Sequence, residues 1–296
     1  HRDLDQFRPD EEYEVVVESS LEPGTLTYGE LRIPGETGDE VLISSHCCHP
    51  SLCNDNLAGI AVAVRLAMEL SARKSRRYSY RFVFAPGTIG AIAWLARNRE
   101  AASNIRHGLV LALLGDPGAQ TYKRSRQGDA FIDRAAAHLL ASAGREGRLL
   151  DFDPEGYDER QYCSPGFNLP VGRLTRSPHG EYPEYHTSAD NLDLVKPEYL
   201  LESLEVVRGI VDAIERDRVY LNRSPYGEPQ LGRRGLYAHF GGEAGERLRK
   251  AVLWVLNASD GKASLLEIAE HSGMPFAAIA DAAELLSSKD LLEELA

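Results

Sequence analysis

Residues 40–59 read EVLISSHCCHPSLCNDNLAG, and this stretch carries the strongest fold and site signal in the chain. A β-type run comes first, two histidines and an aspartate follow, and a helical run comes next. Imidazole nitrogen and carboxylate oxygen are the ligands that a zinc-type divalent ion prefers. Open α/β sheets place their sites at the carboxyl ends of strands, so His46, His49 and Asp55 are candidate ligands.

A second cluster of the same chemistry lies far downstream, in residues 184–190, which read EYHTSAD. Two such clusters suggest one metal site that the fold closes. Simpler readings stay open. The histidines could be unrelated, the cysteines could suggest a zinc finger although no second pair at finger spacing follows, and 54–56 could be only a turn and helix cap.

The bulk composition is that of an ordinary globular protein, with 43% hydrophobic and 26% charged residues among 296. The net charge of −12 argues against a polyanion as the main partner. No apolar run approaches the roughly 18 residues of a membrane span, and no signal or transit peptide is visible. The four cysteines do not form a disulfide-type framework. We therefore expect a cytoplasmic protein with neither a nucleic acid nor a membrane as partner.

Strand and helix patterns alternate along the first two thirds of the chain, which predicts an α/β domain with a mostly parallel sheet. The expected strands are 12–18, 24–33, 41–45, 78–85, 105–114 and 169–174, and the expected helices are 57–72, 90–98, 128–144 and 197–218. A break rich in Pro and Gly follows. We therefore predict an α/β domain over 1–222, a linker over 223–240 and a small helical module over 241–296.

Three short helical runs, 245–256, 264–271 and 275–287, predict a winged-helix-like module. The run that would be the recognition helix, PFAAIADAAELL at 275–286, contains no Lys or Arg to meet phosphate or guanine. A packing or dimerisation role is therefore favoured over DNA binding, and a homo-oligomer is among the expected assemblies.

Five motifs together carry a family resemblance: VLISSHCCHPSLCNDNLAG, FVFAPGTIGAIAWL, LLGDPG, DERQYCSPGFNLPVGRLTR and EYHTSADNL. They resemble bacterial aminopeptidase-like proteins, which carry a zinc-peptidase-like core and a C-terminal winged helix. SPYGEPQLGRRGLY is similar to the join between those two parts. More distantly, the core resembles the family 28 metallopeptidases. The resemblance implies a three-layer α/β/α, phosphorylase/hydrolase-like core, a mostly parallel sheet and an added helical module.

Only some of the site residues of the family have a matching residue in this sequence. Asp55 matches the bridging aspartate, His186 the late histidine and Asp116 a strand-end carboxylate. His46 stands at the strand-end position, but His49 in CHP is favoured as the family's histidine. The chain departs from the larger family at the Glu-Glu pair, where Gly87-Thr88 stands. Because that pair supplies a general base and a metal ligand, one zinc ion is favoured over two.

The resulting hypothesis is a zinc-dependent aminopeptidase or amidohydrolase, with His49, Asp55 and His186 holding one ion and leaving an open position. The substrate would be a small peptide or an aminoacyl amide. Glu184 is the first candidate for the general base, followed by Glu159 and Asp158. Further candidates for substrate contact are Asp158, Arg160, Arg176 and Tyr185.

Two other classes stay open. A catalytically inactive peptidase-like protein could bind a small molecule, a peptide or a protein partner at the old site, and the missing Glu-Glu pair supports that reading. The third class is a regulatory or nucleic-acid protein led by its C-terminal module.

Overall fold

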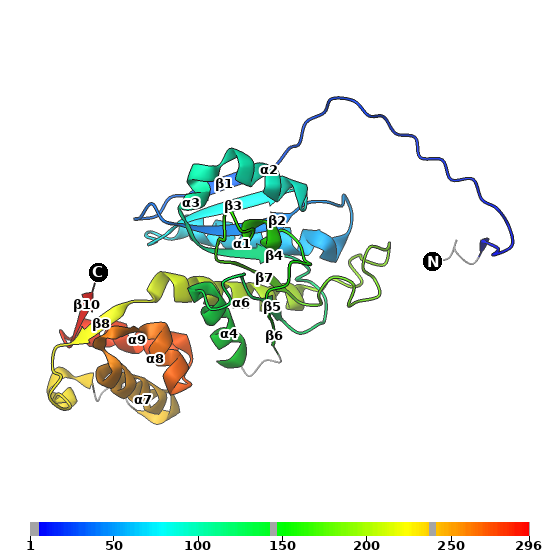
Figure 1. The fold of residues 1–296 in the computed structure, drawn as a ribbon. Coiled ribbons are helices and arrows are strands. Elements are labelled where there is room, and N and C mark those ends of the chain that lie inside the picture. The colour runs from blue at the N-terminus through cyan, green and yellow to red at the C-terminus, as the bar shows by residue number, and fades with distance from the viewer. Residues whose placement is uncertain (1–5, 143–146, 237–240, 296) are drawn as a thin grey trace.

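The computed structural model describes residues 6–142, 147–236 and 241–295, and Figure 1 shows a large sheet-centred part followed by a small helical part. The strands are β1 (Gly29–Ile33), β2 (Glu40–His46), β3 (Ser79–Ala85), β4 (Ile105–Leu111), β5 (Thr121–Lys123), β6 (Arg148–Leu150), β7 (Val171–Thr175), β8 (Val219–Asn222), β9 (Asp260–Ser264) and β10 (Leu292–Leu295). The helices are α1 (Gly59–Ala72), α2 (Ile89–Arg97), α3 (Arg99–Ser103), α4 (Phe131–Ser142), α5 (Glu159–Tyr162), α6 (Pro197–Arg216), α7 (Gly242–Ala258), α8 (Leu265–Ser272) and α9 (Phe276–Ser287). A π-helical turn η2 (Cys53–Ala58) precedes α1, and a 3-10 turn η3 (Leu231–Arg234) precedes α7.

The large sheet has the strand order β1-β3-β2-β4-β7-β5-β6. Its four central strands β3, β2, β4 and β7 run parallel to one another. At one edge β1 pairs antiparallel with β3, and at the other β5 pairs antiparallel with β7, while β6 runs parallel to β5. The prediction of a mostly parallel central sheet is confirmed. All four parallel strands therefore end at the same edge, which is where β2 delivers the 46–59 segment.

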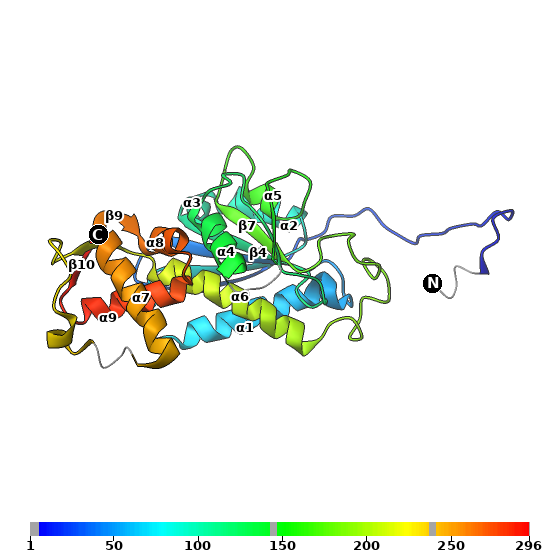
Figure 2. The same cartoon turned by 90° about the horizontal axis from the view of Figure 1, so that it is seen from below.

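Helices cover both faces of this sheet and give the predicted three layers (Figures 1 and 2). The central strand β2 is buried along its whole length, and its side chains alternate between the two faces. Val41 and Ile43 pack with α1, α4 and α6 on one face, while Leu42 packs with α2, α3 and α5 on the other. A strand buried on both faces reads as a continuous apolar run, which is why 41–43 predicts a buried strand.

The N-terminal segment differs from its prediction. Residues 12–28 form neither helix nor strand, and Figure 1 shows them as an extended arm that leaves the body of the molecule. The predicted strand over 12–18 is therefore wrong, and the strand predicted over 24–33 begins only at Gly29. The pattern EVVV has the β-type composition, but no neighbouring strand accepts its backbone hydrogen bonds, and Val15 and Val17 are more than three-quarters exposed.

The small part contains α7, α8 and α9 with the three-stranded sheet β10-β8-β9. The helix α8 starts at a capping box, in which Ser264 accepts from the backbone of Glu267 and the Glu267 side chain accepts in return. The strand β8 pairs with both β9 and β10, so Val219–Asn222 belongs to this sheet. The module thus begins before residue 222, because the strand that precedes the Pro/Gly-rich segment completes its sheet. Residues 143–144 of one predicted helix and 237–240 of the predicted linker lie outside the described residues.

Ion pairs join the module to the large part. Arg216, at the end of α6, pairs with Asp281 and Glu284 of α9, at 2.6 and 2.8 Å. Arg134 of α4 pairs with Glu267 and Glu270 of α8. The acidic side chains of α9 therefore face a cation of the same chain. Among the described residues, no helix is both long enough and apolar enough to cross a membrane.

Candidate metal centre

Two loops meet at the carboxyl edge of the large sheet, and Asp190 holds them together. Its carboxylate accepts the backbone N–H groups of Asn54, at 2.5 Å, and Asp55, at 3.0 Å, and its carbonyl accepts that of Cys53. On the other side, the Asn56 amide donates to Ser45 Oγ and to the Leu111 carbonyl. These contacts fix the start of η2 against the ends of β2 and β4.

The loops bring together the three residues that the sequence analysis favours as ligands. One ligand atom each from His49, Asp55 and His186 lies within 4.8 Å of the other two. Asp55 Oδ2 is 3.0 Å from His186 Nε2 and 3.7 Å from His49 Nδ1. The Asp55 side chain is fully buried, whereas the side chains of His186 and His49 are 50% and 31% exposed. The cluster therefore has the buried Asp55 carboxylate at its bottom, and the two imidazoles stand at its solvent-exposed side.

His46 lies behind Asp55 and holds its other oxygen. The distance from His46 Nε2 to Asp55 Oδ1 is 2.7 Å, and both side chains are fully buried. Burial lowers the pKa of His46, so its imidazole is neutral and donates Nε2–H. Burial alone would raise the pKa of Asp55, but the hydrogen bond from His46 and the neighbouring imidazoles outweigh that effect and lower it. The structure thus gives His46 the role of a positioning residue for an ionised Asp55.

The remaining carboxylates that we predicted lie outside this cluster. Asp116 is buried and accepts hydrogen bonds from Asn54 Nδ2, Gly118 N and Ser177 Oγ, so it braces the loops. Glu184 contributes its backbone carbonyl to Thr187 within the late loop, and its half-buried carboxylate is not part of the cluster.

Glu159 and Asp158 are neighbours with opposite surroundings. Glu159 is fully buried and forms ion pairs with Lys123, at 3.1 Å, and Arg173, at 3.2 Å. Asp158 is also buried, and its Oδ1 has no hydrogen-bond partner. Burial, aided by the negative charge of Glu159, raises the pKa of Asp158 to about 8. Asp158 can therefore carry a proton at neutral pH, while the Glu159 carboxylate is held in its ion pairs with Lys123 and Arg173.

The residues that we predicted to contact the substrate also differ in their surroundings. Arg176 is buried and donates to the Gly118 carbonyl and to Glu202, so it makes internal contacts. Arg160 is exposed on α5. Tyr185 stacks on His186 with ring centroids 3.9 Å apart, which places it at the open side of the cluster.

Two aromatic residues at the site were missed by the sequence reasoning. Tyr157 packs on His46, with ring centroids 4.0 Å apart, and its hydroxyl lies 3.3 Å from Cys48 Sγ. His179 stacks on Tyr157 with ring centroids 4.9 Å apart, and its buried Nε2 has no hydrogen-bond partner among the described residues. Burial and the nearby Arg173 lower the pKa of His179 to about 4, so it is neutral. The feature of the sequence that could have indicated this part of the site is His179 itself, a second histidine seven residues before His186.

Gly87 stands where the family resemblance implies a glutamate, and the structure shows what lies beside it. A Cβ atom at position 87 would overlap the ring of Tyr157, and the Gly87 N–H lies 3.0 Å from Cys48 Sγ. Tyr157 therefore occupies the space into which a side chain at position 87 would extend.

The donor set fits a zinc ion. Two imidazole nitrogens and one carboxylate oxygen are the ligand types of catalytic zinc sites, which use three protein ligands and keep one position open. Ligand atoms about 2.0–2.1 Å from a common centre in a tetrahedral arrangement lie roughly 3.4 Å apart. The distances from Asp55 Oδ2 to His186 Nε2 and to His49 Nδ1, 3.0 and 3.7 Å, bracket that value. The His46 hydrogen bond to the ligating carboxylate is the usual outer-shell support of such sites.

Residues 9–217 match the family described as a domain of unknown function (DUF4910), and residues 218–294 match a winged helix-turn-helix family. The chain belongs to the DUF4910 family. A Clostridium acetobutylicum protein described as a "Putative polysaccharide biosynthesis protein with aminopeptidase-like domain" is 50% identical over 285 residues, which is 96% of this chain and 65% of that protein. A crystal structure described as a "putative peptidase" from the same organism matches 99% of this chain and 66% of that one, at 46% identity and a TM-score of 0.89.

The chain thus spans slightly less than two thirds of the length of these relatives. More distant structural neighbours include a zinc aminopeptidase from Bacillus subtilis, with 17% identity, coverage of 63% of this chain and 49% of that one, and a TM-score of 0.53. Porphyromonas gingivalis glutaminyl cyclase has 17% identity, coverages of 62% and 75%, and a TM-score of 0.54. At such identities the likeness shows the fold alone. The resemblance to an aminopeptidase-like core with a C-terminal winged helix is confirmed.

Proposed function

We propose that this DUF4910 protein is a zinc-dependent hydrolase that cleaves the amide bond next to the free amino terminus of a short peptide or an aminoacyl amide. The observation that carries the proposal is the convergence of His49, Asp55 and His186, which come from loops 131 residues apart, on one solvent-facing point. The cluster has three ligands, and we propose a single ion there.

The residues of the chain would divide the chemistry between them. When bound, the zinc ion polarises a carbonyl group and lowers the pKa of a bound water towards about 7. Asp55 stays ionised because His46 donates to it. Asp158 follows Tyr157, whose ring packs on His46, and burial raises the pKa of Asp158 to about 8, so its carboxyl group is suited to hold or release a proton. Glu184 is the alternative proton acceptor. Tyr185, stacked on His186, would form one wall for the substrate.

One observation favours a second function, that of an inactive peptidase-like binding protein. The ring of Tyr157 fills the space beside Gly87, where the larger family carries its glutamate pair. A metal-loaded site without a base would bind peptides without turning them over. Both functions need the metal cluster, so a measurement of metal content cannot distinguish them, whereas a measurement of turnover can.

Metal content is the first experiment. Protein purified without chelator and dialysed against zinc should hold about one ion per chain, and His49→Ala, Asp55→Asn and His186→Ala should each lose it. His271→Ala, an exposed histidine of the module, is the matched control and should keep it. A wild-type protein that binds no zinc-class ion would defeat the proposal.

Turnover is the second experiment. The zinc, cobalt and manganese forms should release the amino-terminal residue from unblocked peptides and aminoacyl amides, and should leave amino-acetylated peptides intact. Peptides with amino-terminal glutamine belong in the panel, because cyclisation without loss of a residue would indicate a cyclase. Asp158→Asn should lower kcat by a factor of about 10² to 10⁴ with zinc content unchanged. If only Glu184→Gln has this effect, Glu184 is the base.

We also propose that the protein works in a reducing compartment such as the cytoplasm, because all four of its cysteines are free and Cys48 contacts the site. A nucleic-acid partner is not part of this proposal, since the candidate recognition helix has no Lys or Arg to meet phosphate and its Asp281 and Glu284 pair with Arg216 of α6. A duplex-binding assay at low and moderate salt tests the latter point.

A further inference from the structure

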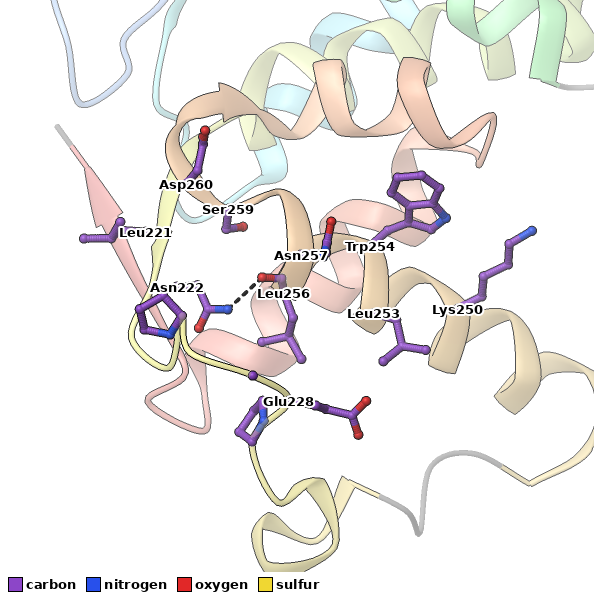
Figure 3. A pocket seen from close by; sticks show the side chains of 13 residues that line it. Leu221, Asn222, Glu228, Lys250, Leu253, Trp254, Leu256, Asn257, Ser259 and Asp260 are labelled. Carbon is purple, nitrogen blue, oxygen red and sulfur yellow. Dashed lines mark hydrogen bonds between the residues drawn. The ribbon is translucent and has the colours of Figure 1, made fainter.

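The C-terminal module contains a groove that is separate from the metal centre. It lies between α7 and the loop from Pro225 to Pro229 and has a volume of about 810 Å³ (Figure 3). Pockets that hold small ligands typically measure about 300–1,000 Å³. Leu221, Leu253 and Leu256 form apolar parts of its lining, together with the two prolines.

One stripe of α7 lines the groove. Lys250, Leu253, Trp254 and Asn257 follow the i, i+3, i+4, i+7 spacing, so they share one face of the helix. The intervening Ala251, Val252 and Val255 are buried in the module core. The four side chains of the stripe are half-buried or exposed, and of the four only Trp254 also packs against the edge of the module core.

Three charged side chains line the groove: Glu228 on the loop, and Lys250 and Asp260, which carry opposite signs at the two ends of the groove along α7. Lys250 stands at the earlier end of the stripe, and Asp260 lies just beyond the C-terminal end of the helix. The helix dipole adds negative potential at that second end. The Asp260 carboxylate accepts backbone N–H groups from Lys262 and Ala263, which lower its pKa and keep it ionised.

A polar atom without a partner lies at the same end. Ser259 is 3% exposed and lines the groove, and its Oγ has no hydrogen-bond partner in the part of the chain that the structure describes. Its neighbour Asn222 already has partners at both side-chain atoms, since Asn222 Nδ2 donates to the Leu256 carbonyl (Figure 3) and Oδ1 accepts from Ser224 N. A ligand that brings an N–H donor would satisfy Ser259.

We propose that this groove binds a short peptide with free termini, with its ammonium group at the Ser259–Asp260 end and its carboxylate at Lys250. Lys250 and Ser259 lie nine residues apart, which is about 14 Å at 1.5 Å per residue, and an extended tetrapeptide spans about 14 Å at roughly 3.4 Å per residue. The apolar lining accommodates the side chains between the termini. The inference rests on the groove alone and does not require the metal centre to be active.

Trp254 provides the measurement. The chain has two tryptophans, and the other, Trp94, is fully buried in the large part. The protein used is the full chain carrying Asp55→Asn, so that turnover at the metal centre does not interfere. Titration with Ala-Leu-Leu-Ala should change the emission of Trp254 in a saturable way, and Trp254→Phe should abolish that change. Calorimetry gives the Kd independently.

The charge pattern is tested with blocked peptides. Amino-acetylation or carboxyl-amidation should each weaken binding about fivefold, as expected for one exposed ion pair. In Lys250→Ala the amidated and free peptides should bind equally, and in Asp260→Asn the acetylated and free peptides should do so. Arg247→Ala, an exposed residue of α7 outside the groove, should behave like its parent. No binding at millimolar peptide, or binding indifferent to both blocking groups, would overturn the proposal.

Discussion

The carboxylate of Asp190 and the backbone of Asp55 form the link on which the candidate metal centre depends. Asp190 Oδ2 accepts Asp55 N–H at 3.0 Å, and its other oxygen accepts Asn54 N–H at 2.5 Å. Because Asp190 follows His186 by four residues, the same short loop supplies one candidate ligand and fixes another.

Asp190→Asn should therefore weaken zinc binding by a factor of about 10 to 100, the usual cost of losing an outer-shell partner. The amide keeps the size of the side chain but can present only one acceptor oxygen to two N–H donors. Zinc affinity is measured by competition with a chelator of known affinity. Asp193→Asn, an exposed position three residues on, is the control. Equal affinities for the two variants would contradict the proposed role.

His46→Leu should raise the pH at which zinc binding is half-maximal. The hydrogen bond from His46 lowers the pKa of Asp55, so its loss raises that pKa and protons compete with zinc up to a higher pH. His46→Gln keeps an N–H donor and should recover part of the wild-type profile. The measurement is zinc affinity against pH, and a His46→Leu profile that overlays the wild type would refute the assignment.

Gly87→Ala should destabilise the fold by about 1–3 kcal/mol, because its Cβ would overlap the Tyr157 ring. Truncating that ring in Tyr157→Ala should remove most of the penalty, so the double mutant should be less destabilised than the sum of the single ones. Chemical denaturation measures the free energies of unfolding. Gly38→Ala is the control, since no atom lies within 4 Å of a Cβ there. Additive effects at 87 and 157 would argue against direct contact.

Glu40→Gln should cost about 3 kcal/mol of stability at neutral pH, since Glu40 is buried between Arg81 and Arg32. Burial alone would raise the pKa of Glu40, but the hydrogen bonds from both arginines lower it below its ordinary 4.5. The stabilisation is thus complete above pH 4.5 and is lost as pH falls through the folded-state pKa. The gap between wild type and variant should narrow in acid, and a gap independent of pH would contradict this account.

Arg216→Ala should loosen α9 from the large part, because one guanidinium pairs with both Asp281 and Glu284. The partners are largely exposed, so we expect a loss of about 1 kcal/mol that shrinks as salt rises. Faster hydrogen exchange in α9 at low salt is the measurement. Arg247→Ala, exposed on α7, should leave that exchange unchanged.

Much of the fold follows from local pattern. Alternating apolar runs and helical periodicities predict β2, β3, β4, β7, α1 and α6 close to their observed bounds. The short strands β5, β6, β9 and β10 escape prediction because three to five residues carry too little pattern. The arm over 12–18 shows the reverse error, since a strand composition forms a strand only where a neighbouring strand accepts its hydrogen bonds.

Residue types and their periodicity were enough to predict the candidate ligands, the strand that delivers them and the order of the two parts, because these are local properties. Only the tertiary structure decided which candidates meet. It joined His49, Asp55 and His186, placed His46 behind Asp55, and committed Glu159 and Arg176 to internal pairs. Distance, burial and pKa depend on residues that are remote in the chain, so no local pattern could supply them.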